Sequence, residues 1–138
     1  MKKCFYLFLP VFLAASACHK DGQKQCDTFF VITAASSVAV TTVTAGIPVV
    51  VNSYGGDMCF HYTGLSVSQQ SSPSGPVYLN QYFIRATGIR DCGDEVVCAQ
   101  ALVNARDSIM VRPATAGTYY LHFQNATGLF RTDTVVVN

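Results

Sequence analysis

The chain has 138 residues, of which half are hydrophobic and 12% are charged. This length suits one ordinary domain, and so hydrophobic a composition excludes a disordered tail. Nine basic against eight acidic residues leave a net charge of +1, which excludes a strongly electrostatic nucleic-acid-binding protein. Threonine and valine are abundant, and long stretches of helix-forming residues are missing, so the composition favours strands.

The first segment predicts an export signal followed by a lipid attachment site. A short basic head precedes an apolar run over residues 5–15, which is shorter than the about 20 residues that a membrane-spanning helix needs. Ala15-Ser16-Ala17-Cys18 then resembles the lipobox of bacterial lipoproteins, in which the cysteine is acylated and becomes the mature N-terminus. We therefore expect residues 1–17 to be a signal peptide and Cys18 to carry the lipid that anchors the protein to the membrane. The alternative is ordinary cleavage that leaves Cys18 free.

A polar tether, residues 18–25, follows the signal. Lys20-Asp21 resembles the surface-export signals of lipoproteins from the Bacteroidota. His19 stands where an aspartate would retain a lipoprotein in the inner membrane. We expect an outer-membrane lipoprotein that faces the periplasm or the cell surface.

From residue 26 onward, short β-rich runs alternate with turn residues at the spacing of about 8–12 residues that is typical of a β-sandwich. No run after the signal shows helical periodicity, although the loop over residues 88–100 has room for one helical turn. The sequence predicts a single all-β domain over residues 26–138, with strands over residues 28–33, 38–44, 47–53, 59–68, 77–86, 102–112, 118–124 and 129–137.

Residues 116–123, Ala-Gly-Thr-Tyr-Tyr-Leu-His-Phe, resemble the start of strand F in immunoglobulin-like domains. Tyr119 takes the place of the tyrosine corner, and Leu121 takes that of the usual core cysteine two residues later. Strand alternation then turns Tyr119 and Leu121 inward and His122 outward. We expect an immunoglobulin-like antiparallel β-sandwich in which the buried Tyr119 hydroxyl bonds to the backbone near residues 113–116.

Five short motifs extend this resemblance; they lie at residues 44–49, 55–60, 98–103, 116–123 and 134–137. Together they are similar to a group of small immunoglobulin-like lipoproteins from the Bacteroidota, over most of the chain from Thr41 onward. No activity is assigned to that group. The resemblance therefore implies a fold and carries no catalytic residues across.

Four cysteines fall within the predicted domain: Cys26, Cys59, Cys92 and Cys98. An even number in an exported chain predicts two disulfides, whereas metal-ligand spacings such as Cys-x-x-Cys are missing. In an immunoglobulin-like sandwich the strand at residues 47–53 should pair antiparallel with the strand at residues 102–112. This pairing brings all four cysteines to one pole, where three disulfide pairings are possible. The resemblance implies Cys59–Cys98 with Cys26–Cys92, because Cys59 and Cys98 stand at motif positions of that group; a Cys92–Cys98 bond is the alternative.

The sequence carries no recognisable catalytic motif. A glycosidase needs two facing carboxylates, whereas the dense acidic group of Asp91, Asp94 and Glu95 falls in one loop. We interpret that group as a solvated surface, with calcium binding as the alternative. Residues 64–68 fail the Gly-x-Ser-x-Gly pattern of serine hydrolases, and glycine-rich phosphate loops are missing. We expect neither an enzyme nor a bound cofactor.

Two histidines and three tyrosines are the remaining candidates for binding. An immunoglobulin-like fold places His61 and His122 outward on neighbouring strands C and F, which makes them weak metal candidates because two ligands are too few for a firm zinc site. Tyr78, Tyr82 and Tyr120 are candidates for stacking on sugars or anchoring a protein partner, although about half of them should fill the core.

The sequence thus predicts a non-catalytic, lipid-anchored immunoglobulin-like module with a binding or structural role at the bacterial cell envelope. Its expected partners are the membrane, through lipid on Cys18, and an unknown protein or glycan; nucleic acid is not expected. A surface sugar- or metal-binding lipoprotein is the alternative, and a cell-wall hydrolase is the least favoured because few acids are present to line a cleft.

Overall fold

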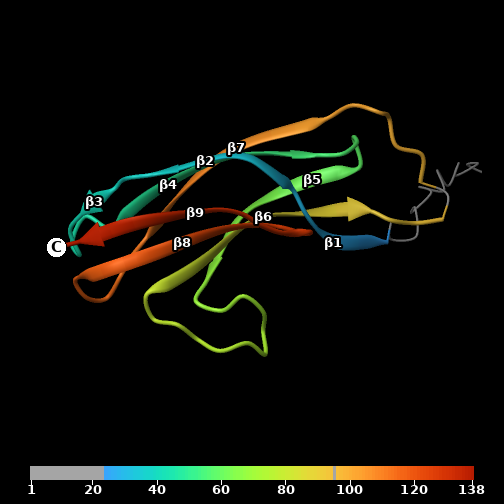
Figure 1. The fold of residues 1–138 in the computed structure, drawn as a ribbon. Helices are drawn as coiled ribbons and strands as arrows, with labels where there is room; N and C mark the ends of the chain where they lie inside the picture. Colours follow the sequence, from blue (N-terminus) through green and yellow to red (C-terminus); the bar gives the residue numbers. More distant parts are fainter. Residues whose placement is uncertain (1–23, 95) are drawn as a thin grey trace, which may run out of the picture.

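The computed structural model describes residues 24–94 and 96–138. The predicted signal peptide, Cys18 and nearly all of the tether lie outside the described residues. Within the described ranges the chain forms strands and no helix, and two sheets pack together (Figure 1). Residues 24–94 and 96–138 contain no helix that is long and apolar enough to cross a membrane. The predicted all-β sandwich is confirmed.

The smaller sheet has three antiparallel strands in the order β2 (Val31–Ser37), β4 (Ile47–Gly55) and β7 (Val103–Val111). Strand β4 pairs with β7 along its whole length, from Ile47 opposite Val111 to Gly55 opposite Val103. Its residues alternate between buried and less buried positions, as expected for a strand with one face on the core. The expected antiparallel pairing of these two strands is therefore correct.

The larger sheet is built around β6 (Gln81–Asp91). Strand β5 (Phe60–Ser68) pairs with one edge of β6, while β8 (Gly117–Asn125) and β1 (Gln25–Phe29) share its other edge. Strand β9 (Gly128–Val137) forms a hairpin with β8, and β3 (Val40–Thr41) runs parallel to the end of β9.

The order of these strands departs from the immunoglobulin pattern. In that fold, the strand that follows β4 in sequence lies beside β8, in the place of strand C. Here β6 lies between β5 and β8, and β6 runs parallel to β8. The central place suits β6 because its inward residues Tyr82, Ile84 and Ala86 are all buried, whereas the inward residues of β5 are only partly so. The immunoglobulin-specific part of the prediction is not confirmed.

Three expected strand boundaries were wrong. The run at residues 28–33 divides into β1 and β2, because the chain crosses between sheets at the fully buried Phe30. The run at residues 38–44 yields only the two residues of β3, since Thr42 bonds to the backbone N–H of Ala45 and Gly46 bonds back to Thr42 in a turn. The strand predicted at residues 77–86 is observed as β6, which begins at Gln81 and ends at Asp91. The loop that was predicted at residues 88–100 therefore begins after Asp91.

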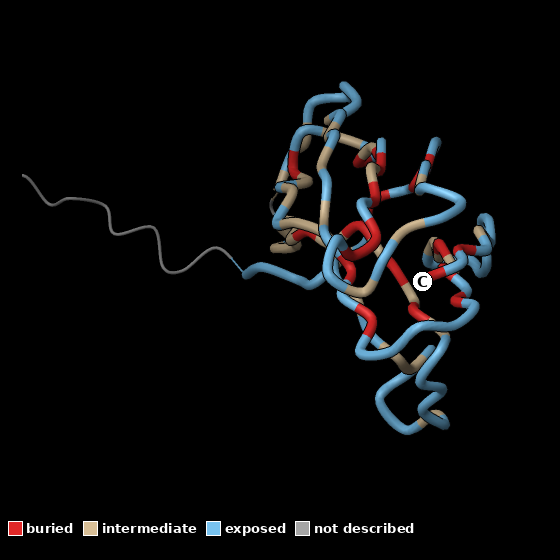
Figure 2. Tube along the Cα trace, turned by 90° about the vertical axis from the view of Figure 1, so that its left-hand side faces the viewer, coloured by how far each residue is buried: buried red, intermediate tan, exposed pale blue. Residues whose placement is uncertain are grey.

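Buried segments lie mainly on the strands and exposed ones mainly in the loops and outer faces (Figure 2). Phe30 occupies one end of the core, where its ring packs edge-to-face on Phe60 and Tyr62 at centroid distances of 5.9 and 5.3 Å. Gly88 lies against this ring. A Cβ at Gly88 would come within 2.6 Å of both the Phe30 ring and the His61 carbonyl oxygen, so only glycine fits there.

An inward-pointing aspartate bridges the two sheets on each side of the sandwich. On one side the Tyr62 hydroxyl of β5 donates to Asp107 of β7 at 3.0 Å. On the other the Ser37 hydroxyl of β2 donates to Asp133 of β9 at 2.8 Å. Asp107 points inward from β7, which is an edge strand, and charged residues placed in this way are a known defence against unwanted edge pairing. The two bridges therefore join the sheets on both sides, and Asp107 also discourages pairing of the β7 edge with other chains.

Candidate functional site

All four cysteines of the domain lie at one end of the sandwich, here called the disulfide pole. Cys26 is bonded to Cys92 and Cys59 to Cys98, with Cα separations of 6.0 and 5.5 Å. This is the pairing that the family resemblance implied, and the alternative Cys92–Cys98 bond is not formed. The first described residue, Lys24, lies at the same pole, where its carbonyl oxygen accepts a hydrogen bond from the N–H of Cys92 at 2.9 Å.

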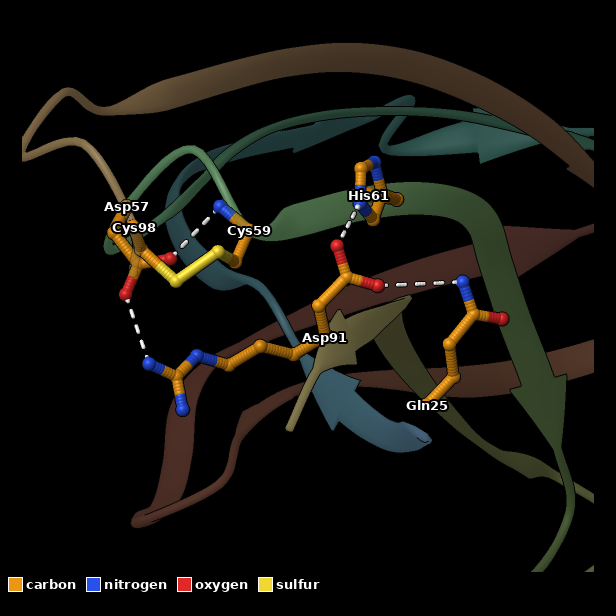
Figure 3. The surroundings of a disulfide bond; sticks show 7 residues. Gln25, Asp57, Cys59, His61, Asp91 and Cys98 are labelled. Carbon is orange, nitrogen blue, oxygen red and sulfur yellow. Dashed lines mark hydrogen bonds and ion pairs between the residues drawn. A yellow bond between two sulfur atoms is a disulfide. The ribbon is translucent and has the colours of Figure 1, made fainter. Parts of the chain in front are cut away.

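Asp57 organises the surroundings of the Cys59–Cys98 bond (Figure 3). Its carboxylate accepts hydrogen bonds from the backbone N–H of Cys59 at 2.9 Å and from the guanidinium of Arg90 at 3.1 Å. Ligand-type atoms of Asp57, Cys59 and Cys98 all lie within 4.8 Å of one another. Both sulfur atoms are held in the disulfide, however, and a cysteine sulfur binds a metal strongly only as a thiolate. The oxidised cluster is therefore structural.

His61 and Asp91 are hydrogen-bonded to each other on the outer surface of the same pole. The His61 Nε2 atom lies 3.2 Å from one oxygen of Asp91, and the amide of Gln25 donates to the other at 3.4 Å (Figure 3). Asp91 ends β6 and links three strands, so its assignment to a solvated loop was wrong. Asp94 is exposed after β6, and Glu95 lies outside the described residues.

His122 is packed rather than freely exposed. Its ring stacks on Phe83 at a centroid distance of 4.9 Å, and its Nδ1 atom lies 2.9 Å from the Thr132 hydroxyl. The Nε2 atom is buried with no hydrogen-bond partner among the described residues. Burial lowers the pKa of His122 below its usual 6.5, because desolvation penalises the charged ring.

The expected pairing of His61 with His122 was wrong. Strand β6 separates the two strands that carry them. His61 lies opposite Ile89 and His122 opposite Phe83, near the two ends of β6. The central position of β6 therefore removes the geometric basis for a two-histidine metal site.

Tyr119 forms the corner that its sequence motif predicts. Its side chain is buried, and its hydroxyl donates to the carbonyl oxygen of Thr115 at 2.9 Å. Leu121 is fully buried on the same face of β8. The Tyr119 ring also stacks on Tyr82 at a centroid distance of 5.9 Å. The register of β8 is thus the predicted one.

The three candidate tyrosines divide between core and surface. Tyr82 is buried, and burial is the main cause that raises its pKa. Tyr78, in the loop that precedes β6, is 47% exposed, and Tyr120, in the first half of β8, is 37% exposed. The two exposed rings lie at the end of the sandwich opposite the disulfides. This end, with the loops at residues 42–46, 69–80 and 112–116, is here called the distal pole.

A cavity of about 420 Å³ opens at the distal pole. Its lining comes from the end of β5, the start of β6 and the loop after β7; the residues are Val67, Ser68, Gln69, Tyr82, Arg112 and Ala114. Arg112 is exposed and forms no ion pair with the described residues. This cavity was not predicted from the sequence, in which Arg112 stands only as the last residue of a predicted strand. The feature of the sequence that could have indicated it is Arg112, a single charged residue among neutral loop residues.

No protein-family model matches the chain, and no similar curated protein or solved structure was found.

Proposed function

We propose that this protein is a non-catalytic binding module held at the bacterial cell envelope by lipid on Cys18. The observation that supports this proposal is that the domain has two poles of different character. The chain enters at the disulfide pole, whereas the cavity and the exposed Tyr78 lie at the distal pole. A lipid attached a few residues before Lys24 leaves the distal pole facing away from the membrane.

A non-catalytic role is supported by what the aspartates do. Asp57 binds Cys59 and Arg90, and Asp91 binds His61 and Gln25. Asp107 and Asp133 each bridge the two sheets. These four carboxylates serve the fold, and hydrolysis of a glycosidic bond requires two that face a substrate.

Fractionation of cells that express the full chain tests the anchor. The wild-type protein should be found in the membrane fraction, and Cys18→Ser should move the exported domain to the soluble fraction, because the acyl chains supply the attachment. Cys4→Ser is the matched control and should change nothing, since Cys4 falls within the expected signal peptide. A Cys18→Ser protein that is cleaved yet remains on membranes contradicts the proposal.

A further inference from the structure

We propose that the disulfide pole lies against the lipid bilayer, where Met58, Val97 and Leu102 insert among the lipid headgroups. The inference rests on the proposed function, because it takes lipid on Cys18 as the anchor, and it adds the surface by which the domain itself contacts the membrane. It is carried by a group of exposed apolar side chains at this pole, by the bonds that hold them together, and by the short length of chain that separates the pole from Cys18.

Exposed apolar side chains from two loops of the disulfide pole form a surface that is here called the apolar rim. One loop joins β4 to β5 and the other joins β6 to β7; the rim residues are Met58, Val97, Ala99, Ala101 and Leu102. Val97 is 96% exposed, Leu102 is 61% exposed and Met58 is 53% exposed. Exposed apolar side chains that gather in one place indicate a contact with a membrane or with another protein.

Covalent and hydrogen bonds hold the two loops of the apolar rim together. The Cys59–Cys98 disulfide joins the residue that follows Met58 to the residue that follows Val97. The N–H of Met58 also donates to the carbonyl oxygen of Ala99 at 3.1 Å. The rim is therefore a preformed surface, and its side chains do not have to be gathered when a partner binds.

The loop between β6 and β7 forms the outer end of this pole. In Figure 1 the segment, coloured gold to orange, extends past the ends of the neighbouring strands. Residues 96–103 carry no charged side chain, and Gln100 is their single amide. Leu102 lies beside the end of β4, because the next residue, Val103, pairs with Gly55. An uncharged apolar segment is thus placed at the outermost part of the pole.

The length of chain before the domain limits how far this pole can stand from a bilayer. Cys18 precedes Lys24 by six residues, and a fully extended chain spans at most about 3.6 Å per residue, which gives a reach of about 20 Å. Lys24 itself is held at the pole by the hydrogen bond from the N–H of Cys92 to its carbonyl oxygen. A lipid on Cys18 therefore keeps the apolar rim close to the bilayer, and the bilayer is the apolar surface that the anchor itself supplies.

The charges of this pole favour shallow insertion into a zwitterionic membrane. Asp57 is paired with Arg90, and Asp91 accepts hydrogen bonds from neighbouring side chains. Asp94 is exposed in the same loop as Val97, and Glu95 lies outside the described residues. A carboxylate is repelled by anionic lipids and is costly to bury in hydrocarbon. The rim should therefore reach the boundary between headgroups and acyl chains and go no deeper.

Quenching of an introduced tryptophan by brominated lipid tests the proposal. The chain contains no tryptophan, so Val97→Trp adds a single fluorescent reporter to the rim. The full lipidated chain is reconstituted into phosphatidylcholine vesicles whose acyl chains are either unmodified or brominated near the ester end. We expect the brominated lipid to lower the fluorescence by at least about twofold, because interfacial side chains lie at the boundary between headgroups and acyl chains. Leu102→Trp is a second reporter, which should be quenched in the same way and keeps the test decisive if Val97→Trp fails to fold.

Two further variants serve as controls. Leu79 is 76% exposed in a loop of the distal pole, so Leu79→Trp places the same reporter on a side chain of similar exposure at the opposite end, and its fluorescence should be equal in the two kinds of vesicle. Met58→Ser together with Leu102→Ser, introduced into the Val97→Trp chain, should reduce the quenching by about half, since interfacial binding scales with the apolar area that is buried.

Each other outcome contradicts the proposal. Rim reporters that are not quenched, or that are quenched no more than Leu79→Trp, show that the domain has no preferred contact with the bilayer. A blue shift of the Val97→Trp emission without quenching shows that a second copy of the chain covers the rim instead. Flotation of the vesicles separates this inference from the anchor on which it rests. A chain that floats with the vesicles without quenching overturns the contact alone, whereas a chain that does not float overturns the anchor and the contact together.

Discussion

Tyr119 ties strand β8 to the loop that precedes it. The ring fills the core between the sheets, and the hydroxyl satisfies the carbonyl oxygen of Thr115, four residues earlier. Its neighbour Tyr120 lies on the other face of the strand and is 37% exposed. The difference in stability cost between substitutions of these two adjacent tyrosines therefore reports which of them faces the core, and so the register of β8.

Substitution of each tyrosine should distinguish the stability contribution of the buried Tyr119 from that of the exposed Tyr120. Tyr119→Phe removes the hydroxyl with its two hydrogen bonds to Thr115 and should lower the free energy of unfolding by about 0.5–1.5 kcal/mol. Tyr119→Ala also opens a cavity and should cost about 3–5 kcal/mol, as for Phe→Ala in a core. Tyr120→Ala should cost about 0.5 kcal/mol, as surface changes do. Urea unfolding measures all three, and the opposite order of the alanine variants contradicts this register.

Asn125 plays a similar joining role at the opposite end of β8. Its side-chain oxygen accepts a hydrogen bond from the N–H of Ile32 at 2.7 Å, just after Phe30 where the chain changes sheets. Asn125 also begins the hairpin turn that ends at Gly128, whose φ of +139° favours glycine. The Asn125-Ala-Thr127 triplet therefore belongs to the turn that joins β8 to β9.

At the scale of elements, side-chain hydrogen bonds join edge strands that belong to different sheets. Strands β5 and β7 belong to different sheets, and the Tyr62–Asp107 hydrogen bond joins them. Asp107 also accepts a hydrogen bond from the backbone N–H of Ser108 at 2.7 Å. Burial, followed by the hydrogen bond and charge of Asp107, raises the pKa of Tyr62 well above its usual value of 10.0.

The raised pKa of Tyr62 predicts a loss of stability in alkali. Below pH 10 the hydroxyl is neutral in both states, and its contribution is fully present. Above pH 10 the unfolded chain releases this proton before the folded chain does, so the free energy of unfolding falls as pH rises. Tyr62→Phe should reduce this slope, and at pH 7 it should cost about 1.5 kcal/mol, the low end for a hydrogen bond to a charged group.

Urea unfolding of wild type and Tyr62→Phe between pH 7 and about pH 11 measures both effects, since this range includes the pH at which tyrosine titrates. Ser37→Ala is the control, because it removes the bridge to Asp133 on the other side without removing a titrating group. Identical slopes for wild type and Tyr62→Phe would contradict the assignment.

At the scale of the whole molecule, the two disulfides close long segments of chain at one pole. Their partners are 66 and 39 residues apart in sequence. In the chain-entropy model each bond stabilises the fold by about 4 kcal/mol, because it restricts the unfolded chain. That is a large fraction of the about 5–15 kcal/mol that holds a typical domain together. The disulfide pole is therefore the covalently secured end, which suits an attachment point.

Peptide mapping of the exported protein without reduction should recover Cys26 linked to Cys92 and Cys59 linked to Cys98, with no free thiol among them. Replacing either bonded pair by serines should lower the free energy of unfolding by about 4 kcal/mol. A peptide that links Cys92 to Cys98, or two free thiols in fresh protein, contradicts this arrangement.

Local patterns in the sequence determined the fold class and most strand positions. Alternation of apolar residues placed β4, β5, β7, β8 and β9 within two residues of their observed ends, because one face of each strand must be buried. The same alternation, with the corner motif, determined that Tyr119 and Leu121 point inward. The possible disulfide pairs followed from cysteine number and export, and the resemblance selected among them.

Only the tertiary structure decided which strands are neighbours. Alternation specifies the faces of a strand, but the place of a strand in a sheet depends on competition for burial among segments far apart in sequence. Strand β6 took the central place, and this separated His61 from His122. The distal cavity arose in the same way. Gln69, Tyr82 and Arg112 come from three separate segments, and only the packing of their strands brings them around one opening.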